Sequence, residues 1–280
     1  MSWRETVLSF SCKDASLLGV LSAPTGEASG LGLIIVVGGP QYRVGSHRQF
    51  VLLARALASQ GRRVLRFDCR GMGDGEGAAS NFENFSADIG AAVAALRGNG
   101  AQRVVLWGLC DAASAILLHL DEQGAQAGVD GIVLLNPWVR SAASLARTHV
   151  KHYYLQRLMQ REFWLKLLRG GVAGKALGDL FGNLRSARKS TASAGSFQQR
   201  MARAWRAFPG PVLLLLSGQD YVAKEFLDHC NATPDSVGLL SLPGVMRADL
   251  LEADHTFSTA AWRAEVETLT GNWLQARFPS

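Results

Sequence analysis

The apolar residues of this chain gather in short continuous runs rather than in long alternating ones. Runs of this kind are typical of strands that are buried on both faces of a parallel sheet. Between the runs lie longer stretches in which apolar residues recur with helical spacing. The pattern predicts strands at 6–11, 17–22, 31–37, 62–68, 103–108, 131–136, 211–218 and 237–244, and helices at 47–59, 82–97, 111–120 and 258–277.

Strands that alternate with helices predict an α/β fold with a doubly wound, mostly parallel sheet. The alternation breaks between about Val139 and Phe208, where only a helical pattern and small-residue linkers occur. We therefore predict an α/β core formed by residues 1–138 and 208–280. Residues 139–207 are predicted to be a helical cap that is inserted between two core strands.

The distribution of charge sets the predicted cap apart from the core. The chain has a net charge of +6, but residues 140–206 carry fourteen Lys and Arg residues against only Glu162 and Asp179. A basic, partly apolar helical segment favours either a lid on the core or contact with an anionic membrane or polysaccharide. No nucleic-acid recognition motif accompanies the charge, so no nucleic-acid partner is expected.

Cysteine usage and the N-terminus indicate the compartment. The four cysteines are scattered without a C-x-x-C pair, which argues against a zinc site and against a disulfide framework. No apolar run approaches the ~18 residues of a membrane span, and the charged N-terminus does not resemble a secretory signal. We expect a cytoplasmic protein, with a peripheral location at the inner membrane left open, and no metal or cofactor.

The segment "LWGLCDAAS" (106–114) is the strongest candidate for chemistry. It runs from an apolar strand through Gly108 to Cys110 and on into small helix-forming residues, as in the nucleophile elbow of α/β-hydrolases, G-x-nucleophile-x-G. Ala112 replaces the second glycine, and a small side chain at this position is tolerable. A thiol needs a base and the base needs an acid. Asp220 follows a predicted strand and His255 precedes the last helix, in the chain order that this fold requires.

Each member of this triad has an alternative. For His255 these are His47, His119 and His229, which are expected at the start, inside and at the end of helices. Cys110 taken alone could be a buried core cysteine, since free cysteines are among the most buried residues. Asp249 and Asp254 are rival acids, although neither directly follows the strand at 211–218. The placement of all three groups after strand ends favours the triad of Cys110, Asp220 and His255.

Acyl transfer also requires N–H donors for a developing oxyanion. We predict that the backbone N–H groups of Asp111 and Gly39 fill this role, with Gln41 in reserve, because Pro40 has no N–H group. The glycines of this loop could equally serve backbone geometry alone.

Several further residues are candidates for substrate binding. Arg43, His47 and Arg48 follow the predicted oxyanion loop and could clamp a carboxylate or phosphate, although a solvated helix start explains them equally well. Trp138, the last residue of the predicted core, is a further candidate, as are His152 and Tyr153, which are expected on the cap face over the cleft.

Longer motifs make the comparison more specific. "GGPQYRVGSHRQF", "RFDCRGMGDGEG", "GLCDAAS", "LLNPWVR" and "KHYYLQRL" together resemble the exosortase A system-associated hydrolase 1 family, a branch of the α/β-hydrolase superfamily. The resemblance implies a cytoplasmic bacterial protein linked to protein sorting and extracellular polysaccharide production. The cysteine elbow also resembles those of dienelactone hydrolases and polyhydroxyalkanoate synthases.

These observations favour a hydrolase that acts on an ester or thioester of a small, lipid-linked or saccharide-linked substrate through an acyl-cysteine. Two alternatives stay open. The first is an acyltransferase to a polysaccharide or lipid-linked acceptor, since an acyl-cysteine can react with an alcohol or amine as well as with water. The second is a non-catalytic protein that binds an anionic partner through the basic cap.

Overall fold

The computed structural model describes residues 1–39, 41–140 and 195–279 of the chain. The chain divides into two compact units, of which the larger comprises Met1–Val139 and Phe197–Ser280. Most of the predicted cap, including His152 and Tyr153, lies outside the described residues. The extent of the cap therefore stays a prediction.

A single mixed sheet forms the centre of the larger unit. Its eight strands follow the order β1-β2-β4-β3-β5-β6-β7-β8. β2 pairs antiparallel with β1 and β4, and the remaining neighbours are parallel. The strands are β1 (Trp3–Cys12), β2 (Ala15–Pro24), β3 (Leu31–Val36), β4 (Arg63–Phe67), β5 (Arg103–Leu109), β6 (Gly131–Leu135), β7 (Val212–Ser217) and β8 (Val245–Leu250).

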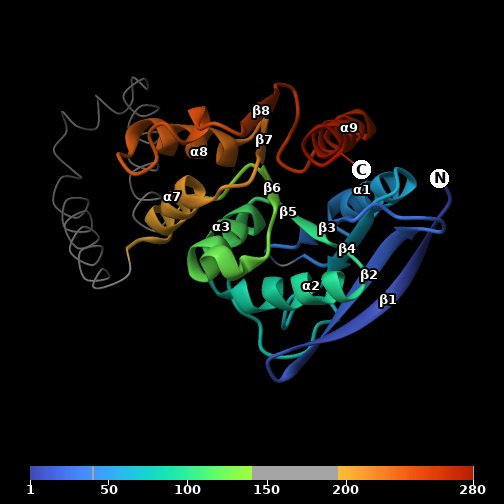
Figure 1. Cartoon of the computed structure of the whole chain (residues 1–280). Helices are drawn as coiled ribbons and strands as arrows, with labels where there is room; N and C mark the ends of the chain where they lie inside the picture. The colour runs from blue at the N-terminus through green and yellow to red at the C-terminus, as the bar shows by residue number, and fades with distance from the viewer. Residues whose placement is uncertain (40, 141–194, 280) are drawn as a thin grey trace, which may run out of the picture. The chain divides into compact units, whose positions relative to one another are not determined.

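Helices cover both faces of this sheet (Figure 1). α1 and α9 lie on one face, α2 and α3 lie on the other, and α7 packs against α3. The described helices are α1 (Gln49–Ser59), α2 (Ser86–Gly98), α3 (Asp111–Gln123), α7 (Phe197–Ala207), α8 (Tyr221–Ala232) and α9 (Ala260–Arg277), with short 3-10 helices η1 (Ser46–Arg48), η2 (Phe82–Asn84), η3 (Gly124–Ala127) and η4 (Leu239–Ser241). The prediction of a doubly wound, mostly parallel α/β sheet is confirmed.

The burial of the central strands explains why the sequence pattern predicted them correctly. Every residue of β3, β6 and β7 is buried, so these strands consist almost entirely of apolar residues. A fully buried Leu or Ile side chain contributes about 1.5–3 kcal/mol relative to an exposed one. The central strands therefore hold the carboxyl-end loops on a rigid base.

The predicted strand at 237–244 is wrong. This segment is a loop around η4, and the eighth strand follows it at Val245–Leu250. Gly238 and Gly244 have positive φ angles of 83° and 86°, which interrupt an extended chain. Leu239 is nevertheless buried, so apolar residues gather here because the loop packs on the core. β8 lies at the sheet edge and is half exposed, so it lacks the apolar run of the central strands.

Helix α7 belongs to the larger unit, although the sequence boundary assigned residues 197–207 to the cap. Arg200 and Arg203 of α7 pair with Asp121 of α3. The side chain of Arg206 donates hydrogen bonds to the carbonyl oxygens of Asp235 and Val237. These three arginines of the basic segment are thus bound within the larger unit.

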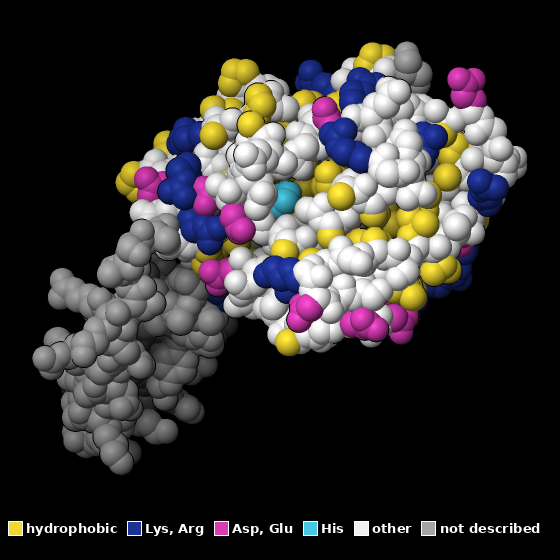
Figure 2. Space-filling model, turned by 60° about the horizontal axis from the view of Figure 1, so that its bottom comes forward, with side chains coloured by type: hydrophobic (Ala, Val, Ile, Leu, Met, Phe, Trp, Pro, Cys, Tyr) yellow, Lys and Arg dark blue, Asp and Glu magenta, His cyan; other side chains and the backbone are white. Residues whose placement is uncertain are grey.

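On the face of the larger unit that Figure 2 shows, basic and acidic side chains are interspersed.

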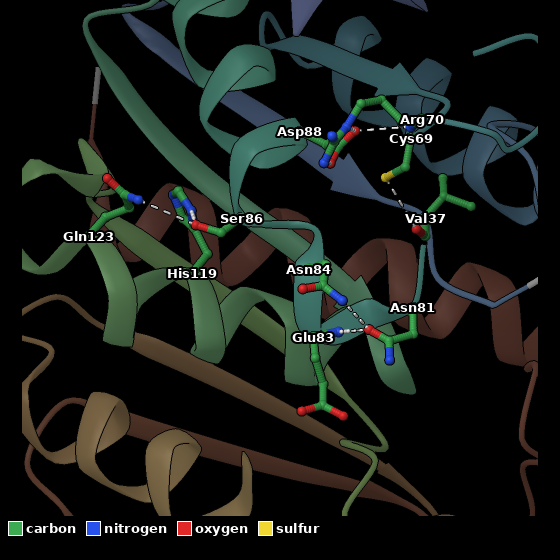
Figure 3. Close-up of polar contacts among 10 residues, drawn as sticks. All are labelled: Val37, Cys69, Arg70, Asn81, Glu83, Asn84, Ser86, Asp88, His119 and Gln123. Atoms are coloured by element: carbon green, nitrogen blue, oxygen red, sulfur yellow. Dashed lines mark hydrogen bonds and ion pairs between the residues drawn. The ribbon is translucent and has the colours of Figure 1, made fainter. Parts of the chain in front are cut away.

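Two polar contacts fix the loop that follows β4 (Figure 3). Arg70 forms a two-pronged ion pair with the buried Asp88 of α2, with both N···O distances at 2.9 Å. The thiol of Cys69 lies 3.8 Å from the carbonyl oxygen of Val37, at the end of β3. These contacts tie the carboxyl ends of β3 and β4 to α2.

Candidate active site

Cys110 occupies a strained corner between β5 and α3. Its φ and ψ angles are 61° and −122°, an arrangement that costs of order 1–3 kcal/mol for a residue with a side chain. The corner is held by a 2.8 Å hydrogen bond from the Cys110 N–H group to the carbonyl oxygen of Leu135. At Gly108 an added Cβ would lie 2.8 Å from the backbone carbon of Ala112, so the strand and helix approach too closely for a larger residue. The sequence thus builds the elbow that its spacing predicted.

His255 and Asp220 come together at the same edge of the sheet. The distance from His255 Nδ1 to Asp220 Oδ2 is 2.7 Å, and Asp220 is buried. Asp220 is the N-cap of α8, and its carboxylate also accepts hydrogen bonds from the N–H groups of Val222 and Ala223. These bonds fix the carboxylate, so the Nδ1–H group of His255 points at it and Nε2 is left for another partner.

The electrostatics of His255 link it to Cys110 as well. A hydrogen bond to Asp220, and next a hydrogen bond to Cys110, raise the pKa of His255 to about 10 against the opposing effect of burial. The imidazole therefore lies between the carboxylate and the thiol. In this arrangement the thiol proton can pass to the imidazole.

Asn136 supports the loop that carries His255. It is fully buried at the end of β6 and has a positive φ angle of 44°. Its Nδ2 group donates to Ser217 Oγ at 2.8 Å and to the carbonyl oxygen of His255 at 3.3 Å, while its Oδ1 accepts the N–H group of Ser217 at 2.9 Å. Sequence reasoning did not include Asn136 among the site residues. A polar residue directly after a buried strand was the feature that could have pointed to this role.

Cys110 and His255 open onto a cavity of about 350 Å³. Its apolar lining is largely aromatic, and its polar lining comes from Cys110, Asp111, His255 and the loop after β3. The lining residues are Gly38, Gly39, Gln41, Phe50, Phe82, Leu109, Cys110, Asp111, Trp138 and His255. A mostly apolar cavity with a few convergent polar groups is typical of small-molecule sites. Sequence reasoning had placed Gly39, Gln41 and Trp138 here, but it missed Phe50 and Phe82.

The predicted oxyanion donors lie opposite each other, but a side chain stands between them. The N–H group of Gly39 donates to Asp111 Oδ2 at 2.7 Å. Burial raises the pKa of Asp111, and hydrogen bonds from the N–H groups of Gly39, Ala112 and Asp111 itself oppose this effect. From the sequence, only the backbone N–H group of Asp111 was predicted to take part in the site. The position of the Asp111 carboxyl group was not predicted.

Three of the predicted substrate-binding residues do not line the cavity. Arg43 forms ion pairs with the buried Asp68 and with Asp74. Its guanidinium is therefore already bound by carboxylates and does not offer a site for an anionic substrate group. His47 and Arg48 both lie in η1 and have positive φ angles of 53° and 61°. The structure therefore favours the structural alternative for Arg43, because its partners face it from the loop after β4.

The rival acids have other partners. Asp249 lies on the exposed edge strand and pairs with Arg247 at 2.8 Å. Asp254 accepts hydrogen bonds from the backbone N–H groups of Thr256 and Ser258, and from the Ser258 hydroxyl. Of the three acids, Asp220 is therefore the one that contacts His255.

The remaining cysteines differ from Cys110 in exposure. Cys12, Cys69 and Cys230 are buried, whereas Cys110 is partly exposed. Burial raises the pKa of Cys12, raises that of Cys69 well above its usual value and raises that of Cys230 to about 12. Thiol reactivity should therefore concentrate at Cys110. Among the described residues, no group of three or more His, Cys, Asp or Glu side chains is placed to hold a metal ion.

Comparison with known families decides the class of the protein. The alpha/beta hydrolase family matches residues 33–268, which is most of the chain. The chain belongs to the alpha/beta hydrolase family. For this α/β-hydrolase the prediction of a hydrolase-type enzyme is confirmed, whereas the exosortase-associated branch stays a prediction. No curated protein matches the sequence.

Solved structures of the same fold are distant in sequence. The esterase Pf2001 of Pyrococcus furiosus shares 15% identity, with a TM-score of 0.65 over 98% of this chain and 93% of that one. Est1E of Butyrivibrio proteoclasticus, solved with ferulic acid bound, shares 14% identity, with a TM-score of 0.64 over 98% of this chain and 100% of that one. DcsB, solved with a substrate analogue, shares 15% identity, with a TM-score of 0.63 over the whole of both chains. At this identity the likeness establishes the fold of the α/β-hydrolase alone.

Proposed function

We propose that this α/β-hydrolase cleaves a carboxylic ester or thioester through an acyl-cysteine intermediate on Cys110. The observation that supports the proposal most strongly is the chain of contacts from Asp220 through His255 to Cys110, and both His255 and Cys110 line a largely apolar cavity. The esterase Pf2001 and the ferulic acid-bound Est1E are consistent with small ester substrates on this fold. The aromatic lining of the cavity suits an apolar or aromatic acyl group.

The first half of the reaction acylates the thiol. The Cys110 thiol first gives its proton to Nε2 of His255, and the anionic sulfur then attacks the carbonyl carbon. A C–S bond forms, and the carbonyl oxygen takes up the electron pair as an oxyanion, which backbone N–H groups stabilise. When the tetrahedral intermediate collapses, the leaving alkoxide or thiolate takes the proton from His255. Asp220 keeps the imidazole oriented and stabilises its protonated form throughout.

The second half removes the acyl group. His255 takes a proton from water, and the resulting hydroxide attacks the thioester carbonyl. Collapse of this intermediate breaks the C–S bond, releases the carboxylic acid and returns the proton to the Cys110 sulfur. An alcohol or amine acceptor could replace water in the same step, so acyl transfer to a polysaccharide or lipid-linked acceptor remains the closest alternative. The proposed link to exosortase and exopolysaccharide systems rests on the sequence resemblance alone.

Turnover of a panel of p-nitrophenyl esters and acyl thioesters tests the proposal. Wild-type protein should release product, while Cys110→Ala should reduce kcat/KM by at least 10³-fold, by analogy with removal of a nucleophile from a triad. A variant of a buried cysteine outside the site, Cys230→Ala, is the matched control and should retain activity. Undiminished turnover by Cys110→Ala would contradict the proposed nucleophile. Product analysis with and without an alcohol acceptor separates hydrolysis from transfer.

The location and the wider partners are proposals as well. Among the described residues no helix is long and apolar enough to cross a membrane. We propose a cytoplasmic enzyme whose basic segment, residues 140–206, contacts an anionic surface. Co-sedimentation with anionic and neutral lipid vesicles tests this contact, and equal binding to both would contradict it.

A further inference from the structure

The carboxyl group of Asp111 occupies the place where the oxyanion of a substrate would bind. Gly39, which the site geometry offers as an oxyanion donor, gives its N–H group to Asp111 Oδ2 at 2.7 Å. The N–H groups of Ala112 and Asp111, at the start of α3, also favour the charged form of this carboxyl group and lower its pKa against the effect of burial. An oxyanion hole has this composition of backbone N–H groups at the start of a helix. Asp111 thus places a negatively charged oxygen where the reaction would create one.

The surrounding backbone leaves room for this carboxyl group. At Gly38 an added Cβ would overlap with Asp111 Oδ1 and would lie 2.7 Å from the backbone nitrogen of Ala112. Glycine at position 38 therefore accommodates both the start of α3 and the carboxyl group. Asp111 is also one of the residues that line the cavity beside Cys110. The carboxyl group that Gly39 binds therefore belongs to a residue of the same cavity wall as Cys110.

This arrangement has a consequence for any acyl donor. A substrate carbonyl can reach the N–H group of Gly39 only when the Asp111 side chain rotates away, because one N–H group cannot serve both oxygens fully. The displaced carboxylate remains on the cavity wall, since it is attached to the first residue of α3. It then repels a negative charge on the substrate and attracts a hydroxyl or ammonium donor. Gln41 Oε1, a buried acceptor that lacks a hydrogen-bond partner among the described residues, lines the same cavity.

We propose that the Asp111 side chain determines which acyl donors this site accepts: it holds the oxyanion N–H groups at rest and excludes donors with a negative charge beside the reacting carbonyl. The inference rests on the proposed function, because it assigns the substrate class of the same site. The preferred donors are neutral or cationic acyl groups, and those with a hydroxyl or amine near the carbonyl can satisfy the displaced carboxylate.

Alkylation of Cys110 by two small reagents tests this inference without a known substrate. Iodoacetamide and iodoacetate carry the same reactive carbon, but only iodoacetate bears a carboxylate next to it. The ratio of their rate constants at Cys110 is measured by peptide mass spectrometry at constant pH and ionic strength. In wild-type protein the ratio should strongly favour iodoacetamide. In Asp111→Asn and Asp111→Ala it should fall about tenfold or more, because a unit charge a few ångströms from the reagent is removed.

Asp111→Ala also leaves the N–H groups of the oxyanion hole without the carboxyl group that binds them. The rate of reaction with iodoacetate, relative to iodoacetamide, should therefore rise more in Asp111→Ala than in Asp111→Asn. Asp111→Asn keeps the shape of the side chain and serves as the test if Asp111→Ala does not fold. Asp249→Asn, on the exposed edge strand, is the charge-matched control and should leave the ratio within twofold of wild type. The same comparison with butyryl and succinyl thioesters should show a parallel rise in kcat/KM for the anionic donor in both Asp111 variants.

The outcomes separate this inference from the proposed function. A Cys110 that reacts readily, with a reagent ratio that does not change in either Asp111 variant, overturns the role of Asp111 while the nucleophile stands. Loss of thioester turnover in both variants, with the ratio unchanged, also overturns it and assigns Asp111 to proton donation instead. A Cys110 that reacts no faster than free cysteine in wild-type protein contradicts the proposed function, and this inference with it.

Discussion

Replacement of Asp220 by Asn tests the electrostatic link between the acid and the thiol. The Asp220 carboxylate is the first cause that raises the pKa of His255 to about 10, through the 2.7 Å contact with Nδ1. Asn is a good N-cap residue, so Asp220→Asn should preserve the start of α8. The variant therefore removes the charge with little change in backbone structure.

The size of the effect follows from the type of bond that is lost. A hydrogen bond to a charged group contributes about 1.5–3 kcal/mol, which corresponds to roughly a 10- to 100-fold change in an equilibrium. Loss of this bond should therefore make protonation of His255 roughly 10- to 100-fold less favourable and lower the pKa of His255 from about 10 accordingly. The imidazole would then be a weaker partner for an anionic Cys110 sulfur. Alkylation of Cys110 by iodoacetamide at pH 7 should slow by about 10- to 100-fold.

The pH profile of the same reaction gives the sign of the effect. In wild-type protein the imidazole stays protonated across neutral pH, because the pKa of His255 is about 10, so alkylation should stay fast in this range. In Asp220→Asn the rate should rise only as the pH approaches ~8.5, where an ordinary thiol ionises. The three buried cysteines should contribute little, and peptide mass spectrometry distinguishes them from Cys110. Identical pH profiles for the two proteins would refute the proposed coupling, while Asp249→Asn controls for a general loss of negative charge.

Three further variants test the supports of the site and the core. Burial lowers the pKa of His119 from 6.5 to about 4, so the free energy of unfolding should fall by up to ~3 kcal/mol as the pH drops from 6.5 to 4. His119→Gln should flatten the dependence of Tm on pH in this window, and an equally steep dependence in the variant would contradict this. Asn136→Ala leaves the buried Ser217 N–H group without its acceptor and should cost about 1–3 kcal/mol in urea unfolding, together with slower alkylation of Cys110; wild-type stability would be the contrary result. Gly38→Ala should lower Tm by several degrees, because overpacking against the Ala112 backbone costs about 1–3 kcal/mol. An unchanged Tm would contradict this and would show that the loop after β3 can move aside.

The central sheet and the elbow could be predicted because their sequence pattern follows directly from burial and spacing. β3, β6 and β7 are buried on both faces, so their apolar runs stand out against the helices. Cys110, Asp220 and His255 follow strand ends, and parallel strands bring their carboxyl ends to the same edge. Topology alone was therefore enough to place these three side chains near one another.

Edges and loops could not be predicted in the same way. β8 is half exposed and mixes Arg247 and Asp249 with apolar residues, while the more apolar loop before it resembled a strand. The ion pairs of Arg43 depend on how the loop after β4 folds back, and sequence spacing does not reveal that. The same holds for Asp111, since its backbone role follows from the elbow but the direction of its side chain depends on the rotamer and on the space at Gly38.

The most direct test of the central claim is intact-protein mass spectrometry after brief incubation with a panel of acyl thioesters and activated esters. Wild-type protein should gain the mass of one acyl group, and peptide mapping should place it on Cys110. Cys110→Ala should show no adduct, and His255→Ala should acylate at least tenfold more slowly, because it lacks the proton acceptor. An adduct that persists in Cys110→Ala, or a wild-type protein that forms none with any donor, would contradict the account of Cys110 as the nucleophile of this α/β-hydrolase.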